Sequence, residues 1–188
     1  SNANCYTAQP VMIGSDDDKT ALTPLTNVRM AAAADVAGFA VTGDGLVYGW
    51  GNTWGGVNGF SKPGTTTQYA HQVVSGAYQD ISGEQFLTDV KEVAGGQGYA
   101  MAVTKEGYLV YWGNSGGPGG VMPNPNYKGT DTNKEGPQFT YYSSGKIVND
   151  AVKIARGDLF GFMVNDKDEY FAFGSNENGE CGLGSTKK

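Results

Sequence analysis

The feature that most constrains this chain is a segment that occurs three times without gaps. Its copies cover residues 41–52, 103–114 and 164–175, and read VTGDGLVYGWGN, VTKEGYLVYWGN and VNDKDEYFAFGS. Gly51, Gly113 and Gly174 hold the same position in these copies. Recurrence at a nearly constant spacing indicates a repeat architecture, in which each unit is one small supersecondary element.

The same order of elements precedes each copy. A run of small residues lies directly upstream, and a short apolar strand that opens with proline or histidine lies further upstream. The small-residue runs are 30–34, 93–96 and 154–157, and the apolar strands are 10–13, 71–74 and 137–141. Each unit is therefore predicted to contain a strand, a loop, a run of small residues and a hairpin.

The second copy shows why a hairpin is expected. Residues 99–104 predict a short strand, Lys105–Gly107 predict a turn in which Gly107 is free to take positive φ, and residues 108–112 are rich in β-formers. One equivalent position holds alanine in two of the three copies, and another holds large aromatics suited to a wedge between neighbouring sheets. These two sets are Ala40, Ala102 and Met163, and Trp50, Trp112 and Phe173. The interpretation is an all-β chain whose short units must stack on one another.

Composition agrees with this interpretation. Glycine supplies 30 of the 188 residues, while 39% of residues are hydrophobic and 12% are aromatic. So much apolar and aromatic content disfavours a disordered chain, and so much glycine favours short strands joined by tight turns.

The repeated residues resemble the repeat of the regulator of chromosome condensation family. The resemblance rests on residues 90–114, with looser matches over 28–52 and 152–176, and on the closing Gly-Leu-Gly at 182–184. Members of this family form β-propellers, usually of seven four-stranded blades. The resemblance therefore implies propeller blades, with three repeats forming a partial, open propeller.

The three repeats are expected at approximately 9–60, 69–120 and 136–185, with long connecting loops, and residues 1–3 look like the remnant of a purification tag. Three repeats cannot close a seven-bladed ring. The chain is therefore interpreted either as a fragment of a longer bacterial propeller protein or as one member of a homodimer that completes the ring. The acidic charge and the loops rich in Gly, Asn, Thr and Pro favour an extracytoplasmic or secreted protein.

The resemblance also implies a non-catalytic module that binds a protein partner across one face of the propeller. In the family, that face is formed by loops just before the inner hairpin strand. The corresponding residues here are Asp35, Val36 and Ala37, then Gln97, Gly98 and Tyr99, then Asp158, Leu159 and Phe160. The alternative is a carbohydrate-binding or enzymatic propeller that uses aromatic residues in or beside the long loops, among them Trp54, Tyr127, Tyr141 and Tyr142.

Other chemistries find little support in the sequence. A net charge of −6 lacks the basic surface on which nucleic-acid and anionic-membrane binding rely, and no apolar run is long enough for membrane insertion. No cofactor or metal site is expected. The G-x-S-x-G pattern at 113–117 is interpreted as turn glycines, His71 as the opening of a strand, and residues 16–18 as a solvated acidic loop. Cys5 and Cys181 are predicted to be separate thiols.

Overall fold

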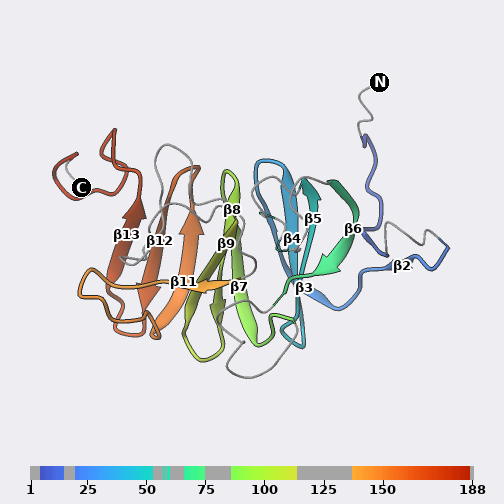
Figure 1. Ribbon diagram of the computed structural model, residues 1–188, viewed down its shortest axis with the longest axis horizontal. Coiled ribbons are helices and arrows are strands. Elements are labelled where there is room, and N and C mark those ends of the chain that lie inside the picture. Colours follow the sequence, from blue (N-terminus) through green and yellow to red (C-terminus); the bar gives the residue numbers. More distant parts are fainter. Residues whose placement is uncertain are drawn as a thin grey trace.

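The computed structural model describes residues 5–14, 20–52, 57, 59, 66–74, 86–113 and 137–186, which form strands joined by turns, with no helix among them. Figure 1 shows the sheets side by side, with the N-terminal segment at one end of the row and the C-terminus at the other. The predicted all-β fold of three successive blades is confirmed. Within these residues, no helix exists that is long and apolar enough to cross a membrane.

Each blade contains the same antiparallel meander of three strands. Blade 1 has β3 (Val28–Ala33), β4 (Ala37–Thr42) and β5 (Val47–Asn52); blade 2 has β7 (Val90–Gly95), β8 (Tyr99–Thr104) and β9 (Leu109–Gly113); blade 3 has β11 (Ala151–Arg156), β12 (Phe160–Asn165) and β13 (Tyr170–Gly174). The register confirms the equivalence read from the sequence, because Trp50 lies opposite Gly38, Trp112 opposite Ala100 and Phe173 opposite Gly161.

The fourth strand of a blade comes from the next repeat along the chain. Strand β6 (Thr66–Gln72) pairs with β5, and β10 (Gln138–Phe139) pairs with β9. The short strands that open the second and third repeats therefore complete the first and second blades. The register also moves one prediction by a residue: His71 faces Gly49 as Gln138 faces Tyr111, so His71 is equivalent to Gln138 and not to Pro137.

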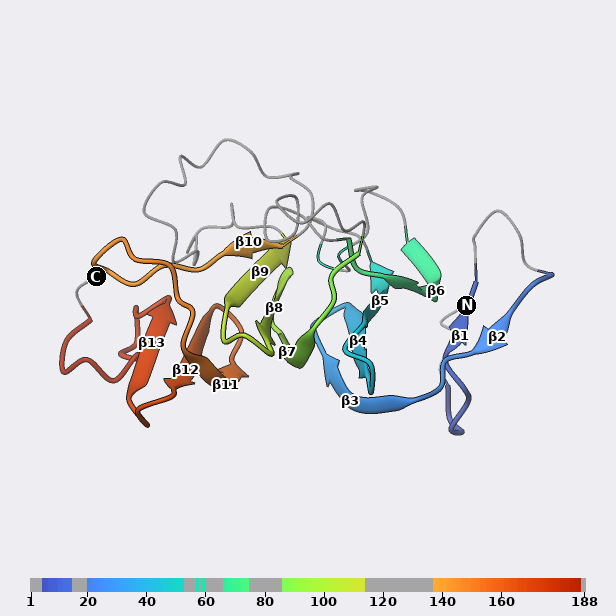
Figure 2. The ribbon, with the colours of Figure 1, turned by 90° about the horizontal axis from the view of Figure 1, so that it is seen from below.

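The two ends of the row differ. The first sheet continues beyond β6 with β1 (Met12–Ile13), which runs parallel to it, and β2 (Thr23–Pro24), which is antiparallel to β1. The third sheet contains β11, β12 and β13 only. Figure 2 shows β1 and β2 at one end and β13 at the other. Among the described residues, blade 3 thus has no fourth strand beside β13.

The turn inside each hairpin requires a left-handed backbone. Gly45 has φ +91° and Gly107 has φ +89°, and a Cβ on Gly107 would lie 2.7 Å from the carbonyl oxygen of Asn149. The third turn keeps this conformation without glycine, since Asp168 has φ +61°. The side chain of Asn165 stabilises that turn by accepting hydrogen bonds from the backbone N–H groups of Lys167 and Glu169 at 3.0 and 2.9 Å.

The core lies between blades, not within them. Alternate residues of β8 face opposite neighbours: Ala100 and Ala102 pack toward blade 1, whereas Tyr99, Met101 and Val103 pack toward blade 3. Both faces of β8 are therefore buried, which explains why the strand reads as an almost continuous apolar run.

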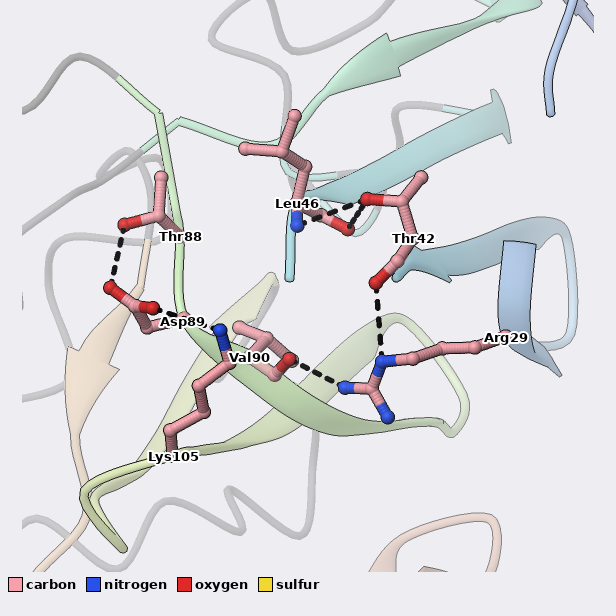
Figure 3. Close-up of polar contacts among 7 residues, drawn as sticks. All are labelled: Arg29, Thr42, Leu46, Thr88, Asp89, Val90 and Lys105. Atoms are coloured by element: carbon pink, nitrogen blue, oxygen red, sulfur yellow. Dashed lines mark hydrogen bonds and ion pairs between the residues drawn. The ribbon is translucent and has the colours of Figure 1, made fainter. Parts of the chain in front are cut away.

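Polar bonds tie each blade to the next. In Figure 3, Arg29 reaches from blade 1, donating to the carbonyl oxygen of Thr42 at 3.1 Å and to that of Val90 in blade 2 at 2.6 Å. Lys91 makes the equivalent bond from blade 2, to the carbonyl oxygen of Ala151 in blade 3 at 3.3 Å. The register places Val152 at this position in blade 3, so the third blade lacks the cation.

Candidate protein-binding face

Three equivalent turns connect the first strand of each blade to the second. In each turn, one backbone N–H donates to a carbonyl oxygen three residues later: Ala34 to Ala37, Gly96 to Tyr99, and Gly157 to Phe160, at 2.8, 2.9 and 3.0 Å. The turns lie along one end of the sheets, at the top of Figure 1. Residues 34–37, 96–99 and 157–160 are called the turn face below. The hairpin turns 43–46, 105–108 and 166–169 lie at the opposite end.

Neighbouring turns of the turn face are in close contact. A Cβ on Gly95 would lie 2.8 Å from the Cβ of Ala34, and the backbone N–H of Gln97 donates to the carbonyl oxygen of Asp158 at 3.0 Å. Glycine at position 95 permits this approach because it has no side chain. The three turns therefore form one continuous surface.

The structure separates the nine predicted face residues by exposure. Asp35, Gln97 and Asp158, which hold the same position in the three turns, are exposed, and Val36 is 41% exposed. The remaining five lie deeper: Ala37, Gly98 and Tyr99 are buried, and Leu159 and Phe160 are half-buried. Four of the nine side chains are thus exposed on the turn face, and the other five are half-buried or buried.

Arg156 is a residue of this region that the sequence analysis missed. It lies where blades 1 and 2 have Ala33 and Gly95, at the end of β11, the first strand of blade 3. Its guanidinium carbon lies 3.4 Å from the centroid of the Tyr99 ring, and its Nη2 donates to the carbonyl oxygen of Asp158 at 3.3 Å. The sequence does contain a signal for it, because an arginine stands where the other two repeats have small residues.

Burial lowers the pKa of the Arg156 guanidinium, and the carboxylate of Asp158 acts in the opposite direction. An arginine remains charged at neutral pH even so. Among the described residues, Arg156 forms no ion pair, and the Nε of Arg156 and the hydroxyl of Tyr99 are both buried without a hydrogen-bond partner. The cation is therefore held by the Tyr99 ring, the backbone carbonyl of Asp158 and the sulfur of Met101, to which Nη1 donates at 3.9 Å. These contacts fix the turn of blade 3 against blade 2.

The loop aromatics of the alternative hypothesis are only partly within the described residues. Trp54 and Tyr127 lie outside them, and Tyr141 is half-buried. The hydroxyl of Tyr142 donates to the carboxylate of Asp150, and its ring packs against Phe171 with centroids 5.1 Å apart. Burial and the bond to Asp150 raise the pKa of Tyr142. Tyr142 therefore belongs to the packing of blade 3.

The remaining candidates have structural places where they are described. His71 is the next-to-last residue of β6, so the prediction that it opens a strand is wrong. Gly113 ends β9 with φ +106°, while residues 114–117 of the G-x-S-x-G pattern and the acidic residues 16–18 lie outside the described part. No group of three potential metal-ligating side chains occurs in the described ranges. Cys5 and Cys181 are free thiols, as predicted.

Comparison with known proteins gives matches among curated sequences and among solved structures. No protein-family model matches the chain. The chain is 26% identical over 187 residues to the E3 ubiquitin-protein ligase HERC2 of human and of mouse, covering 93% of this chain and 3% of HERC2.

Solved β-propeller structures resemble this chain in fold. Human WBSCR16 matches with a TM-score of 0.59 and 21% identity, over 80% of this chain and 35% of that one. Prp20p of Saccharomyces cerevisiae, the yeast RCC1, matches with a TM-score of 0.58 and 19% identity, over 87% of this chain and 37% of that one. The chain thus spans about a third of the solved propellers it matches. It is an arc of three β-propeller repeats of the kind found in regulator of chromosome condensation (RCC1) proteins.

Proposed function

We propose that the chain is a non-catalytic protein-interaction module that binds its partner through the turn face. The observation that carries this proposal is the position of Asp35, Gln97 and Asp158. The repeat places them at the same point of three contiguous turns, and all three side chains are exposed. A partner that spans the three blades would therefore meet a row of evenly repeated polar side chains.

The chemistry of the row favours a basic partner surface. Asp35 and Asp158 place carboxylates at the two ends, Gln97 supplies a neutral hydrogen-bonding group between them, and Val36 adds exposed apolar area. Charges at the rim of an interface mainly steer association and select partners, whereas the fixed surface beneath determines fit. Arg156 contributes to that fit, because it fixes the third turn against Tyr99.

The solved relatives support protein binding as a use of such repeats. Yeast RCC1 (Prp20) was solved bound to Kap60, and the study of Prp20p describes its binding to Gsp1p and histones. Those properties belong to the yeast protein, whose sequence is under 20% identical to this chain. We further propose a bacterial, extracytoplasmic protein, on the basis of its net charge of −6 and its loops rich in Gly, Asn, Thr and Pro.

The test is a pair of charge reversals with a matched control. Asp35→Lys/Asp158→Lys reverses both carboxylates of the turn face, and Asp44→Lys/Asp166→Lys makes the same charge change at the exposed hairpin turns of the same blades. A partner recovered by quantitative pull-down from the source cells is purified, and its Kd and association rate are measured at two salt concentrations.

The proposal predicts at least about a tenfold weaker Kd for the turn-face variant, mostly through slower association at low salt, because paired rim charges steer encounter. The hairpin-turn variant should bind within about twofold of wild type. Equal effects of the two variants, or no effect of either, would contradict binding through the turn face.

A further inference from the structure

Blade 3 presents an aromatic face that no other blade covers within the described part of the chain. Phe160 and Phe162 lie with ring centroids 5.5 Å apart, and Tyr170 stacks on Phe162 at 5.1 Å while remaining 65% exposed. The equivalent residues of blade 2 are Tyr99, Met101 and Leu109, which blade 3 buries almost completely. This face of a blade is therefore buried wherever another blade follows.

Blade 1 presents the complementary face at the other end of the row. Its Trp50 is equivalent to Trp112, which packs between blades 1 and 2 and is 1% exposed, whereas Trp50 is only half-buried. Val28, which begins the first strand, is 43% exposed; the equivalent Val90 and Ala151 are fully buried because a preceding blade covers them. Blade 1 thus has the residues of a covered face, and none of the described blades covers it.

The two open faces carry the equivalents of the aromatic pair that joins blades 1 and 2. Phe39 of blade 1 meets Trp112 of blade 2 edge-on, with ring centroids 5.7 Å apart. Phe162 is the equivalent of Phe39 on the open face of blade 3, and Trp50 is the equivalent of Trp112 on blade 1. Blade 1 of a second molecule therefore offers the open face of blade 3 the aromatic contact that the first interface contains.

The backbone bonds between blades are equivalent at both interfaces within the chain. The hairpin-turn carbonyl of one blade accepts from the first strand of the next, from the N–H of Val90 to Gly45 at 3.1 Å and from that of Ala151 to Gly107 at 2.9 Å. The third turn keeps the required left-handed conformation at Asp168 although it lacks glycine. In a second molecule, the N–H of Val28 is equivalent to those of Val90 and Ala151, and it would donate to the backbone carbonyl of Asp168.

We propose that a second copy of this chain packs its blade 1 against the blade 3 of the first, in continuation of the two interfaces within the chain. The reciprocal contact between the same two molecules closes a ring of six blades with two-fold symmetry, the commonest symmetry of soluble oligomers. This contact lacks the charged hydrogen bond to the next blade, because Val152 stands where blades 1 and 2 have Arg29 and Lys91. The contact between copies is therefore weaker than those within the chain, and lysine at position 152 strengthens it.

Cysteine cross-linking tests the arrangement in the full chain, with Cys5 and Cys181 replaced by serine. The Cα of Asp89 lies 3.2 Å from the position of a Cβ on Gly45, and the corresponding pair between copies is Asn27 and Asp168. Chains that carry Asn27→Cys or Asp168→Cys are mixed and mildly oxidised. The proposal predicts a mixed disulfide dimer, and none when Ser144→Cys, in an exposed turn, replaces Asp168→Cys. Disulfides that form mainly within one type of chain would overturn the head-to-tail contact.

Sedimentation equilibrium of the uncross-linked chain supplies the second test. Wild type should show a dimer of twice 19.8 kDa. Val152→Lys should dimerise at least tenfold more tightly, Phe162→Ala at least tenfold more weakly, and Lys146→Ala, which removes an exposed charge, like wild type. A wild-type monomer at millimolar concentration, a species larger than a dimer, or a Val152→Lys variant no tighter than wild type would overturn the proposal. This equilibrium is measured on the chain alone, so the test is independent of partner binding.

Discussion

Replacing Trp112 with alanine should be among the most damaging single substitutions in the chain. The indole is 1% exposed, its Nε1–H donates to the carbonyl oxygen of Val57 at 3.0 Å, and Phe39 of the neighbouring blade contacts it edge-on. Truncating a buried tryptophan to alanine costs about 3–5 kcal/mol of unfolding free energy, since the cavity cannot fully collapse. That is a large share of the 5–15 kcal/mol that stabilises a typical domain.

Two further substitutions separate the contribution of the hydrogen bond to Val57 from that of burial between the blades. Trp112→Phe keeps most of the apolar contact but leaves the carbonyl of Val57 without its donor, so it should cost about 1–2 kcal/mol. Trp50→Ala removes the equivalent residue from the uncovered face of blade 1, where it is half-buried, and should cost less than Trp112→Ala.

Urea unfolding followed by far-ultraviolet circular dichroism measures all three variants without relying on tryptophan emission. A Trp112→Ala variant that loses no more stability than Trp50→Ala would show that Trp112 does not hold blades 1 and 2 together. In that case the core would not lie between the blades.

Three more predictions use the same unfolding assay. Gly107→Ala should cost at least about 1–2 kcal/mol because φ is +89° and a Cβ would meet backbone, whereas Asp168→Gly should change stability by less than about 0.5 kcal/mol; equal costs would contradict the shared turn geometry. Arg29→Ala should cost about 1.5–3 kcal/mol by removing the charged bonds between blades 1 and 2, and a loss under about 0.5 kcal/mol would show that the tie is dispensable. Tyr142→Phe should cost about 1 kcal/mol at pH 7, and this difference should shrink as the pH rises above 10, because the unfolded tyrosine ionises there before the folded one, whose pKa is raised; a difference that grows with pH would contradict the bond to Asp150.

The hairpins could be predicted from the sequence because their determinants are local. The turn glycines at 45 and 107, the alternation within each strand and the aromatic–glycine pair repeat in order, so residues a few positions apart define each unit. The sheet to which a short strand belongs is different, since it depends on which edge is free. The prediction of an apolar strand at 71–74 is wrong in its bounds, since β6 covers Thr66–Gln72, and the sequence does not show that this strand belongs to the first blade.

The depth of the face residues and the role of Arg156 also required the structure. The resemblance placed Asp35 and Tyr99 on the same face, but the strand register buries Tyr99 and exposes Asp35. Arg156 meets Tyr99 across the boundary between two blades, from a position far away in the sequence. No spacing within one repeat encodes such a contact.

The most direct test of the account is hydrogen–deuterium exchange of the chain with and without its purified partner, read peptide by peptide. Binding through the turn face predicts slower exchange in residues 34–37, 96–99 and 157–160, where the three turns share one backbone hydrogen-bond pattern. Exchange in the hairpin turns 43–46, 105–108 and 166–169, at the opposite end of the same sheets, should not change. Protection confined to those hairpin turns, with the turn face unaffected, would contradict the account.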